Sequence, residues 1–449
     1  MKRVIEMAVE VNIAEDRSSA NEIFSAMGLV LQSIYEQLTA QVLEAYQQQI
    51  VSILCSPSGL RAKKGLGLHD HKSHEGQRCR CRRFKRAGYW QRERRLRGER
   101  GDVSFTVAMV QCCGCGRRLA PVLAALELQP RQTHTEVLLG KVVEAIADTS
   151  YRRSIDQLNV LAEVPVAKST AHRWAASVEM PNGLMEKGDI LGADGTGFKK
   201  RFGNRGMVRL VLKLGTEKGL EPLGVWAGTS WEQIAEELAD AQKGQGRLLL
   251  SDGERGFDHW AGKVVQRAQR GHWHLARDLN HNLWKDGVAR KDRKKQCKQT
   301  SDLLAIEIPE EDFEFVAEAE KNDMRNQIRK AENELQKLSE SFAARGYQNA
   351  STYLRRARDQ LLSHLRLWLD TGIIAPHTTS IVENIIRELV RRLKKIGWNW
   401  SDAGATRMGR IVMIRRYDPD AWIRFWNERI NLRGRCHIRL LHCKLRNAA

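Results

Sequence analysis

Two aspartates stand where carboxylates could share a metal ion. The stretch "LLLSDGERG" (248–256) ends an apolar run on Asp252, and "DILGADGTG" (189–197) places Asp194 in a similar setting. A single aspartate at a strand tip is ordinarily a turn residue or a helix cap. Two carboxylates that lie a few Å apart repel each other, and their pKa values rise unless a cation sits between them. Mg²⁺ or Mn²⁺ suits such a site, because it takes carboxylate oxygens and keeps waters for a substrate; the flanking glycines would let a phosphate backbone come close.

A third carboxylate is expected from a later helix, "TTSIVENIIRELVRRLKK" (378–395). Glu383 lies early in this helix, and Glu388 is the competing acid. It lies five residues on, roughly 140° around the helix, so only one of the two glutamates should face the metals. The turns that follow are basic and suit DNA laid along the helix; the residues that we expect to contact it are Arg387, Arg391 and Lys395.

The periodicity from residue 189 onward predicts the elements that would bring these acids together. It indicates three strands, a helix opened by a capping box of Ser230 with Gln233, and a fourth strand that ends at Asp252. This is the order expected of a ribonuclease-H-like α/β core, in which the first and fourth strands lie side by side. Asp194 and Asp252 would then face each other. We assign this core to residues 187–415, with an all-α insertion at about 288–372.

Cysteines cluster at the two ends of a predicted β-hairpin in residues 78–130. The candidate ligands are Cys79, Cys81, Cys112 and Cys115. Their layout predicts a zinc-ribbon-like unit, in which a tetrahedral Zn²⁺ replaces a missing hydrophobic core. The first pair is more tightly spaced than usual, so His71, His74 or Cys113 could replace one of its ligands. The alternative is a set of unliganded thiols in a basic hairpin.

Two segments ahead of the core are expected to contact DNA. The cysteine-containing unit is too rich in basic residues for solubility alone and predicts a phosphate-contacting surface, formed by Arg82, Arg83, Lys85, Arg86, Arg94 and Arg95. Residues 131–186 are helical in pattern with a break around Pro165, which predicts a helix-turn-helix whose second helix enters the major groove. That helix would present Lys168, Ser169, Thr170, His172 and Arg173. A purely structural helical hairpin would give a similar pattern.

The composition favours a polyanionic partner. The 449 residues carry a formal net charge of +20 with a pI near 9.7, which points to nucleic acid and here to double-stranded DNA. Charge alone would also suit an RNA binder, but the usual aromatic motifs that stack on single strands are not visible. The chain lacks an apolar run of about 20 residues and a secretory cleavage pattern. We therefore expect a cytoplasmic, nucleoid-associated protein without membrane contact, in a multidomain α/β fold.

The remaining segments complete the expected organisation. Residues 1–54 form a helical region that packs within the monomer or, alternatively, dimerises. Residues 55–77, rich in glycine, serine, lysine and histidine, have the composition of a linker. Residues 416–449 form a basic C-terminal tail.

In these motifs the chain resembles a DDE transposase of the bacterial insertion-sequence type, allied to the Mutator-like superfamily. "ADGTG" and "LLLSDGERGF" are similar to the family's two aspartate strands, and "TTSIVENIIRELVRRLKK" is similar to its glutamate helix, with Ser380 where asparagine is more common. In "RGHWHLARDLNHNLW", His274 holds the place of the family's histidine, whereas Gly271 stands where many relatives have cysteine.

The resemblance implies a function. Two divalent ions held by Asp194, Asp252 and Glu383 would activate water for attack on a phosphodiester at the element's end, and the freed 3′-OH would attack target DNA. It implies a homo-oligomer on the terminal inverted repeats, with His274 as a further catalytic candidate. The alternatives are a catalytically silent DNA-binding regulator or domesticated relative, and a structure-selective nuclease on the same fold.

Overall fold

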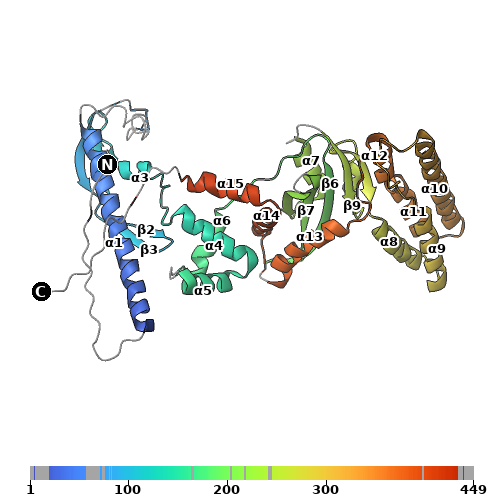
Figure 1. Cartoon of the computed structure of the whole chain (residues 1–449), viewed down its shortest axis with the longest axis horizontal. Helices are drawn as coiled ribbons and strands as arrows, with labels where there is room; N and C mark the ends of the chain where they lie inside the picture. Colours follow the sequence, from blue (N-terminus) through green and yellow to red (C-terminus); the bar gives the residue numbers. More distant parts are fainter. Residues whose placement is uncertain are drawn as a thin grey trace. The chain divides into compact units, whose positions relative to one another are not determined.

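The structure is a computed structural model of the chain, and it divides into two compact units (Figure 1). The N-terminal unit comprises Met1–Ile146 with Tyr151–Ala175, and the C-terminal unit comprises Ala147–Ser150 with Ala176–Ala449. The residues that the structure describes are 5, 20–56, 71–72, 76–79, 81, 83–162, 166–202, 205–216, 219–240, 245–396, 399–432 and 438. Most of the predicted linker, most of the tail after residue 432, and the side chains of His74 and Arg82 lie outside the described residues.

The N-terminal unit is built from one long helix and two small antiparallel sheets. Its first elements are α1 (Ala20–Cys55), β1 (Phe84–Tyr89), β2 (Arg94–Gly98), β3 (Gly101–Phe105), β4 (Ala108–Cys112), β5 (Arg118–Leu119) and α3 (Pro121–Ala125). One sheet has the order β1-β4-β5, and β2 pairs with β3 alone. Ile50, Val51 and Leu54 at the end of α1 pack against Phe84 and Val110. The helix therefore supplies much of the apolar core that the small sheet lacks.

The hairpin predicted around residues 88–112 is present but divided between the two sheets. β2 pairs antiparallel with β3, with Gly98 opposite Gly101. The chain then passes into β4, which pairs with β1, so that Cys112 lies opposite Phe84. This change of partner brings the end of β4 to the segment that carries the first cysteines.

Helices complete the N-terminal unit. They are α4 (Glu136–Asp148), α5 (Tyr151–Ala162) and α6 (Lys168–Ala176). The last two lie where the helix-turn-helix is predicted, and residues 163–165 between them lie outside the described part. Across the described residues, none of the helices combines the length and apolar character needed to span a bilayer.

A five-stranded mixed sheet is the centre of the C-terminal unit. Its strands and the helix between them are β6 (Ile190–Lys199), β7 (Arg205–Thr216), β8 (Gly219–Ala227), α7 (Trp231–Asp240), β9 (Gly246–Ser251) and β10 (Val265–Arg270). The order across the sheet is β10-β9-β6-β7-β8. The first three strands pair antiparallel, whereas β9 is parallel to β6, with Ala193 opposite Ser251. The predicted adjacency of the first and fourth strands is confirmed.

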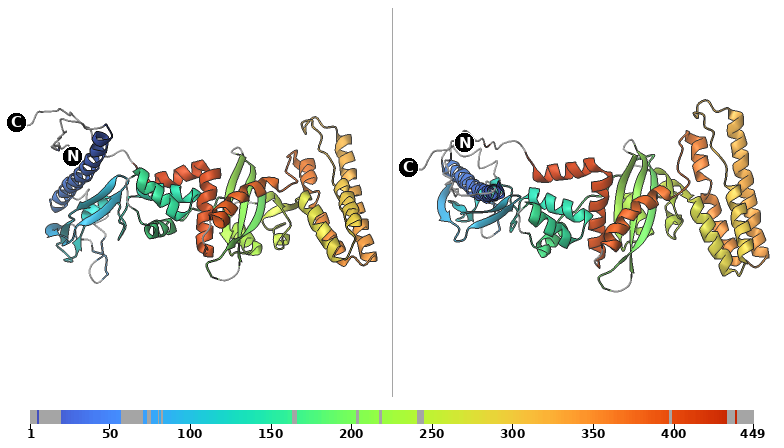
Figure 2. Two further views of the ribbon diagram at one scale, coloured as in Figure 1. Left: turned by 90° about the horizontal axis from the view of Figure 1, so that it is seen from below. Right: turned by 60° about the horizontal axis from the view of Figure 1, so that its bottom comes forward.

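Helices after the sheet form a bundle beside it and a layer upon it (Figure 2). The bundle segment contains α8 (His272–Lys285), α9 (Arg290–Leu303), α10 (Glu318–Ala344), α11 (Gln348–Ala357), η3 (Arg358–Gln360) and α12 (Ser363–Thr371). The later helices are α13 (Ser380–Val390), the π-helical turn η4 (Arg391–Lys395), α14 (Asp402–Tyr417) and α15 (Pro419–Ile430). A short 3₁₀ turn, η2 (Phe257–His259), precedes β10. Helices α8 to α12 share one apolar core. The chain is thus helical across the segment predicted as an insertion, and α15 lies within the predicted tail.

A glycine lets α13 approach the sheet closely. Alternate residues of a strand point to opposite faces. Leu191 of β6 and Leu249 of β9 pack with α7 on one face. Gly192 faces the other way, where an added Cβ would lie 2.6 Å from a methyl carbon of Val382. Asp194 follows the same alternation and points toward the α13 face.

Replacing Gly192 by alanine should push α13 away from β6. Val382 is fully buried and β-branched, so the overlap cannot be relieved by a rotamer change. We expect Gly192→Ala to lower the free energy of unfolding by about 1–3 kcal/mol in denaturant titrations. Gly197→Ala on the same strand is the control, since an added Cβ there would meet its nearest atom only at 3.6 Å. Equal effects of the two substitutions would contradict this role of Gly192.

Candidate metal centres

Asp194 and Asp252 enter the candidate site from neighbouring parallel strands. Ala193 and Ser251 are paired across β6 and β9, and each aspartate follows its paired residue. Both side chains are half-buried. The Oδ1 atom of Asp194 accepts a hydrogen bond of 2.7 Å from the N–H of Gly195, and that of Asp252 accepts one of 2.9 Å from Glu254. These backbone contacts orient both carboxylates without neutralising them.

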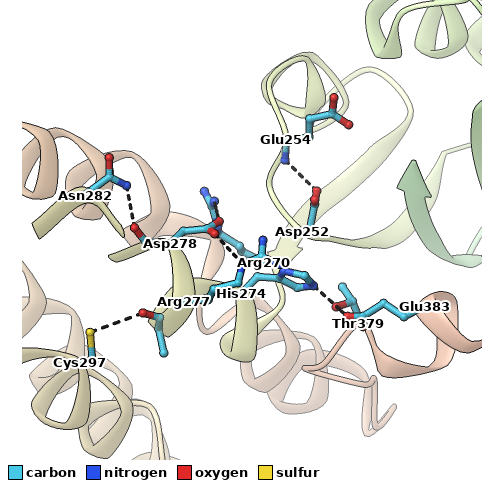
Figure 3. Close-up of polar contacts among 11 residues, drawn as sticks. Asp252, Glu254, Arg270, His274, Arg277, Asp278, Asn282, Cys297, Thr379 and Glu383 are labelled. Carbon is cyan, nitrogen blue, oxygen red and sulfur yellow. Dashed lines mark hydrogen bonds and ion pairs between the residues drawn. The ribbon is translucent and has the colours of Figure 1, made fainter. Parts of the chain in front are cut away.

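Glu383 lies in the first turn of α13, and two side chains from outside that turn hold its carboxylate in place (Figure 3). Its Oε1 atom accepts a hydrogen bond of 2.8 Å from the Thr379 hydroxyl and lies 2.9 Å from Nε2 of His274. Partial burial raises the pKa of Glu383, but the hydrogen bonds from Thr379 and His274 outweigh burial, so the pKa lies below its ordinary value. Glu383 is therefore an oriented, ionised carboxylate.

His274 has a positioning role in this arrangement. The side chain is only 7% exposed, and its Nδ1 has no hydrogen-bond partner. To donate to Glu383, Nε2 must carry the proton, which leaves Nδ1 as the acceptor. His274 lies at the start of α8, so its contact with Glu383 links α8 to α13.

The acids interact electrostatically. The pKa of Asp194 rises to about 7, first because the carboxyl group is buried and then because Asp252, Glu383 and Glu254 repel its negative charge. Glu388 does not share this site: its Oε2 lies 3.1 Å from Nε of Arg391 and 3.4 Å from a guanidinium nitrogen of Arg416. Of the two glutamates, Glu383 is the one whose charge acts on Asp194.

Two further charged residues beside the acids were missed from the sequence. Glu254 accepts a hydrogen bond of 2.7 Å from the Trp231 indole and lies 3.6 Å from Arg209, so it is already engaged by protein groups. Its place two residues after Asp252 is the only sequence signal for it. Arg270, only 8% exposed, occupies the space that a Cβ on Gly253 would need. At Gly253 a guanidinium therefore fills the space that the missing side chain leaves.

The carboxylates fit divalent cations by donor chemistry, although they do not form a tight cage. Within the described part of the chain, one group of potential metal ligands has all its ligand atoms within 4.8 Å of one another. None of the three acids belongs to that group. Three oxygen-donating carboxylates with mutual repulsion nevertheless suit Mg²⁺ or Mn²⁺, which retain several waters as ligands. Asp194, Asp252 and Glu383 are the residues that would hold such ions.

That tight group lies in the N-terminal unit and differs from the predicted zinc ligands by one member. It consists of His71, Cys79, Cys112 and Cys115. Nε2 of His71 lies 3.2 Å from Sγ of Cys115, and the sulfurs of Cys79 and Cys112 are 3.8 Å apart. The sulfur–sulfur distance equals what tetrahedral geometry requires with Zn–S bonds of about 2.3 Å. These four side chains could hold a structural Zn²⁺ ion.

Cys81 is not part of the group, which corrects the predicted set. Its sulfur lies 3.4 Å from the backbone nitrogen of Arg83 and also contacts the Cys112 thiol, and its side chain lies against Gly114. His71 takes the place of Cys81 in the group. Its carbonyl accepts a 2.9 Å hydrogen bond from the N–H of Cys79, which holds His71 beside the segment that carries Cys79.

The thiols of the group have opposite protonation tendencies. A backbone hydrogen bond from Arg117, opposed by burial and assisted by His71, lowers the pKa of Cys115 to about 6. Burial raises the pKa of Cys112 to about 12. Since zinc binds thiolates, Cys115 is ready to bind at neutral pH, whereas Cys112 must release a proton, and zinc affinity should increase with pH.

The basic residues predicted to contact DNA differ in their availability. Those exposed in the N-terminal unit are Arg83, Lys85, Arg86, Arg95, Lys168, Ser169, His172 and Arg173, and Thr170 is half-buried. Arg94 donates to the carbonyl of Gln132, and Arg95 is paired with Asp102. On the α13 side, Arg387 and Lys395 are exposed, but Arg391 binds the backbone of Asp148 at 2.8 Å. Arg94 and Arg391 therefore have structural partners within the protein.

We expect His71 to matter more for zinc than Cys81. His71→Ala removes a ligand and should weaken zinc binding by about a hundredfold or more, measured by competition with a chromophoric chelator. Cys81→Ser is the matched control and should retain one tightly bound zinc. The opposite ranking would restore the cysteine-only set.

The raised pKa of Asp194 predicts a pH-dependent stability. A carboxyl group whose folded pKa is about 7 stabilises the fold fully below pH 4, and this contribution is lost as the pH rises through 7. Asp194→Asn should therefore be more stable than the natural chain at pH 8 without divalent ions, by at most about 4 kcal/mol, and no more stable at pH 4. Excess Mg²⁺ should stabilise only the natural chain. Identical pH profiles of denaturant unfolding for the two proteins would contradict the burial and repulsion at Asp194.

Comparison with known proteins gives no family for this chain. No known family model matches it, and no curated protein matches it. The function therefore has to be argued from the residues and their geometry.

Proposed function

We propose that the chain is a DDE-type transposase, which cleaves DNA strands at the ends of an insertion sequence and transfers them to target DNA. The observation that carries the proposal is that Asp194 and Asp252 follow paired residues of β6 and β9, with Glu383 near enough for its charge to raise the pKa of Asp194. The strand order β10-β9-β6-β7-β8, with α7 between β8 and β9, is also the order of a ribonuclease-H-like core.

The residues around the acids would prepare the site for phosphoryl transfer. Bound at Asp194, Asp252 and Glu383, two Mg²⁺ or Mn²⁺ ions would supply activated water and stabilise the attacking and leaving oxygens of an in-line displacement. His274 and Thr379 fix the Glu383 carboxylate before any ion binds. A carboxylate that is already oriented loses less freedom on binding, which favours a precise site.

Exposed basic residues support DNA as the substrate. In the N-terminal unit, α6 buries Ala171, Trp174 and Ala175, and its other face exposes Lys168, His172 and Arg173. A recognition helix needs this division, since one side must pack on its own unit while the other reads a groove. Lys85 and Arg86 on β1 are exposed as well, and they suit contacts with phosphates. Recognition of terminal repeats by these elements is part of the proposal.

Removing one of the three acids should abolish chemistry while sparing DNA binding. We expect Asp252→Asn and Glu383→Gln to lower Mg²⁺-dependent nicking and joining of labelled terminal-repeat DNA by about a thousandfold or more. Affinity for the same DNA, measured by fluorescence anisotropy without divalent ions, should change less than about threefold, because the contacts to phosphates and bases lie elsewhere.

Glu388→Gln is the matched control on the same helix. Glu388 pairs with Arg391 and Arg416 and should not be required for cleavage. Cleavage that persists in Asp252→Asn would reject the proposal. Nicks without joined products would identify a nuclease, and DNA binding without any cleavage by the natural chain would identify a regulator.

A further inference from the structure

Helix α8 displays two exposed tryptophans on one face. Trp273 is 59% exposed and Trp284 is 58% exposed. Together with Arg277 and Asn280 they follow the spacing i, i+4, i+7, i+11, which places all four along one side of a helix. Tryptophan is strongly buried on average in proteins, so two exposed indoles in line require an explanation.

The opposite face of α8 is firmly anchored. Three leucines of α8 are at most 1% exposed and belong to the apolar core that α8 shares with α9 to α12: Leu275, Leu279 and Leu283. The tryptophans are therefore not needed to close that core. They are presented by a helix whose orientation is fixed by packing, which is the arrangement of a binding platform.

Trp284 lines an open groove between α8 and α9, and Trp273 lies one helical turn before Arg277, another residue of its lining. The groove has a volume of about 690 Å³ and is lined by Arg277, Asp278, Asn280, His281, Trp284 and Arg293. The Arg277 guanidinium carbon lies 5.3 Å from the centre of the Trp273 ring, and the His281 ring stacks on Trp284 with centroids 5.5 Å apart and planes at 21°. Planar groups thus already lie parallel or close to the indoles, as a stacked base would.

The charge beside the groove is positive. Arg293 is fixed by a 3.1 Å hydrogen bond to Asn280 and a 2.7 Å hydrogen bond to the carbonyl of Val288. Besides Arg277 and Arg293 in the lining, the nearest exposed cation of α9 is Arg290, about 60° around the helix from Arg293, whereas the exposed Lys291, Lys294, Lys295 and Lys298 point about 100° or more away. The acid in the lining, Asp278, is compensated by Arg277 at 2.9 Å and Arg270 at 3.4 Å. An anionic ligand is favoured at this face.

The tryptophan face begins at the acid site. The Trp273 ring meets the His274 ring edge to face, with centroids 5.0 Å apart, and His274 contacts Glu383. A DNA strand that leaves Glu383 would therefore reach Trp273 first. From there to Trp284 the helix rises about 16 Å, so a strand must be several nucleotides long to reach both indoles.

We propose that the α8–α9 groove binds unpaired nucleotides of DNA next to the acid site. Bases stack on Trp273 and Trp284, and Arg277, Arg290 and Arg293 contact the phosphates. Sequence-tolerant recognition of single strands uses this combination of aromatic rings and a basic groove. The identity of the ligand as DNA rests on the proposed function, whereas the stacking itself does not depend on catalysis.

The test is binding of a short single-stranded oligonucleotide to the full-length protein without divalent ions. The probe carries 2-aminopurine, whose fluorescence is quenched when the base stacks. We expect Trp273→Ala and Trp284→Ala each to weaken binding by about five- to a hundredfold and to relieve the quenching. Trp273→Phe with Trp284→Phe should retain binding within about threefold, because the rings remain. Affinity should increase with oligonucleotide length until the strand reaches both indoles, and then level off.

Phe315→Ala is the matched control, since Phe315 is a 77% exposed aromatic residue in the same insertion but does not line the groove. A variant that combines Trp273→Ala with Trp284→Ala would overturn the proposal if it bound the oligonucleotide as tightly as the natural chain. An equal loss of binding in Phe315→Ala would overturn it as well. Loss of self-association with unchanged DNA binding would also overturn it, because it would assign the face to a second copy. Failure of cleavage alongside tryptophan-dependent binding would reject only the transposase function.

Discussion

Repulsion between the Asp194 carboxylate and its acidic neighbours is the constraint on which the C-terminal unit depends. Burial and the charges of Asp252, Glu383 and Glu254 bring the pKa of Asp194 to about 7. Such a cluster disfavours the folded chain near neutral pH unless a proton or a cation compensates it. The surrounding structure holds it together by means independent of the acids: β6 and β9 are buried in a continuous apolar sheet, and the missing side chain of Gly192 allows α13 to come close. The acid cluster therefore lowers the stability of the folded chain, and a bound cation would restore it.

Charged groups around the cluster are connected in one network that runs from the sheet to the insertion. His274 joins Glu383 to α8. Arg270, at the end of β10, packs on the backbone at Gly253, lies 4.6 Å from the centre of the Tyr353 ring and reaches Asp278 of α8. The helix that closes the acid site is thus the helix that presents the tryptophans. In the proposed function, this link would position a strand held on α8 relative to the three acids.

The N-terminal unit meets a different physical problem. Its sheets are short, and their apolar residues form small separate clusters completed by α1 and α3. In such a unit a metal ion contributes folding energy that a small core cannot. The four candidate ligands come from two segments: His71 and Cys79 before β1, and Cys112 at the end of β4, 33 residues after Cys79, with Cys115 just after it. One ion would therefore fasten the beginning of the sheet to its end.

The sequence by itself determined the local features. Apolar alternation and capping residues predicted the strands, α7 and the adjacency of β6 with β9, because these follow from periodicity and from a known order of elements. It also named Asp194, Asp252 and Glu383. Tertiary structure alone decided the rest. Which ligand completes the cysteine group depends on a backbone hydrogen bond between His71 and Cys79, not on spacing. The role of Gly253 depends on Arg270, which arrives from another strand. The tryptophans of α8 are left exposed because the leucines on the opposite side of the helix are buried, and a sequence alone does not show which side of a helix remains exposed.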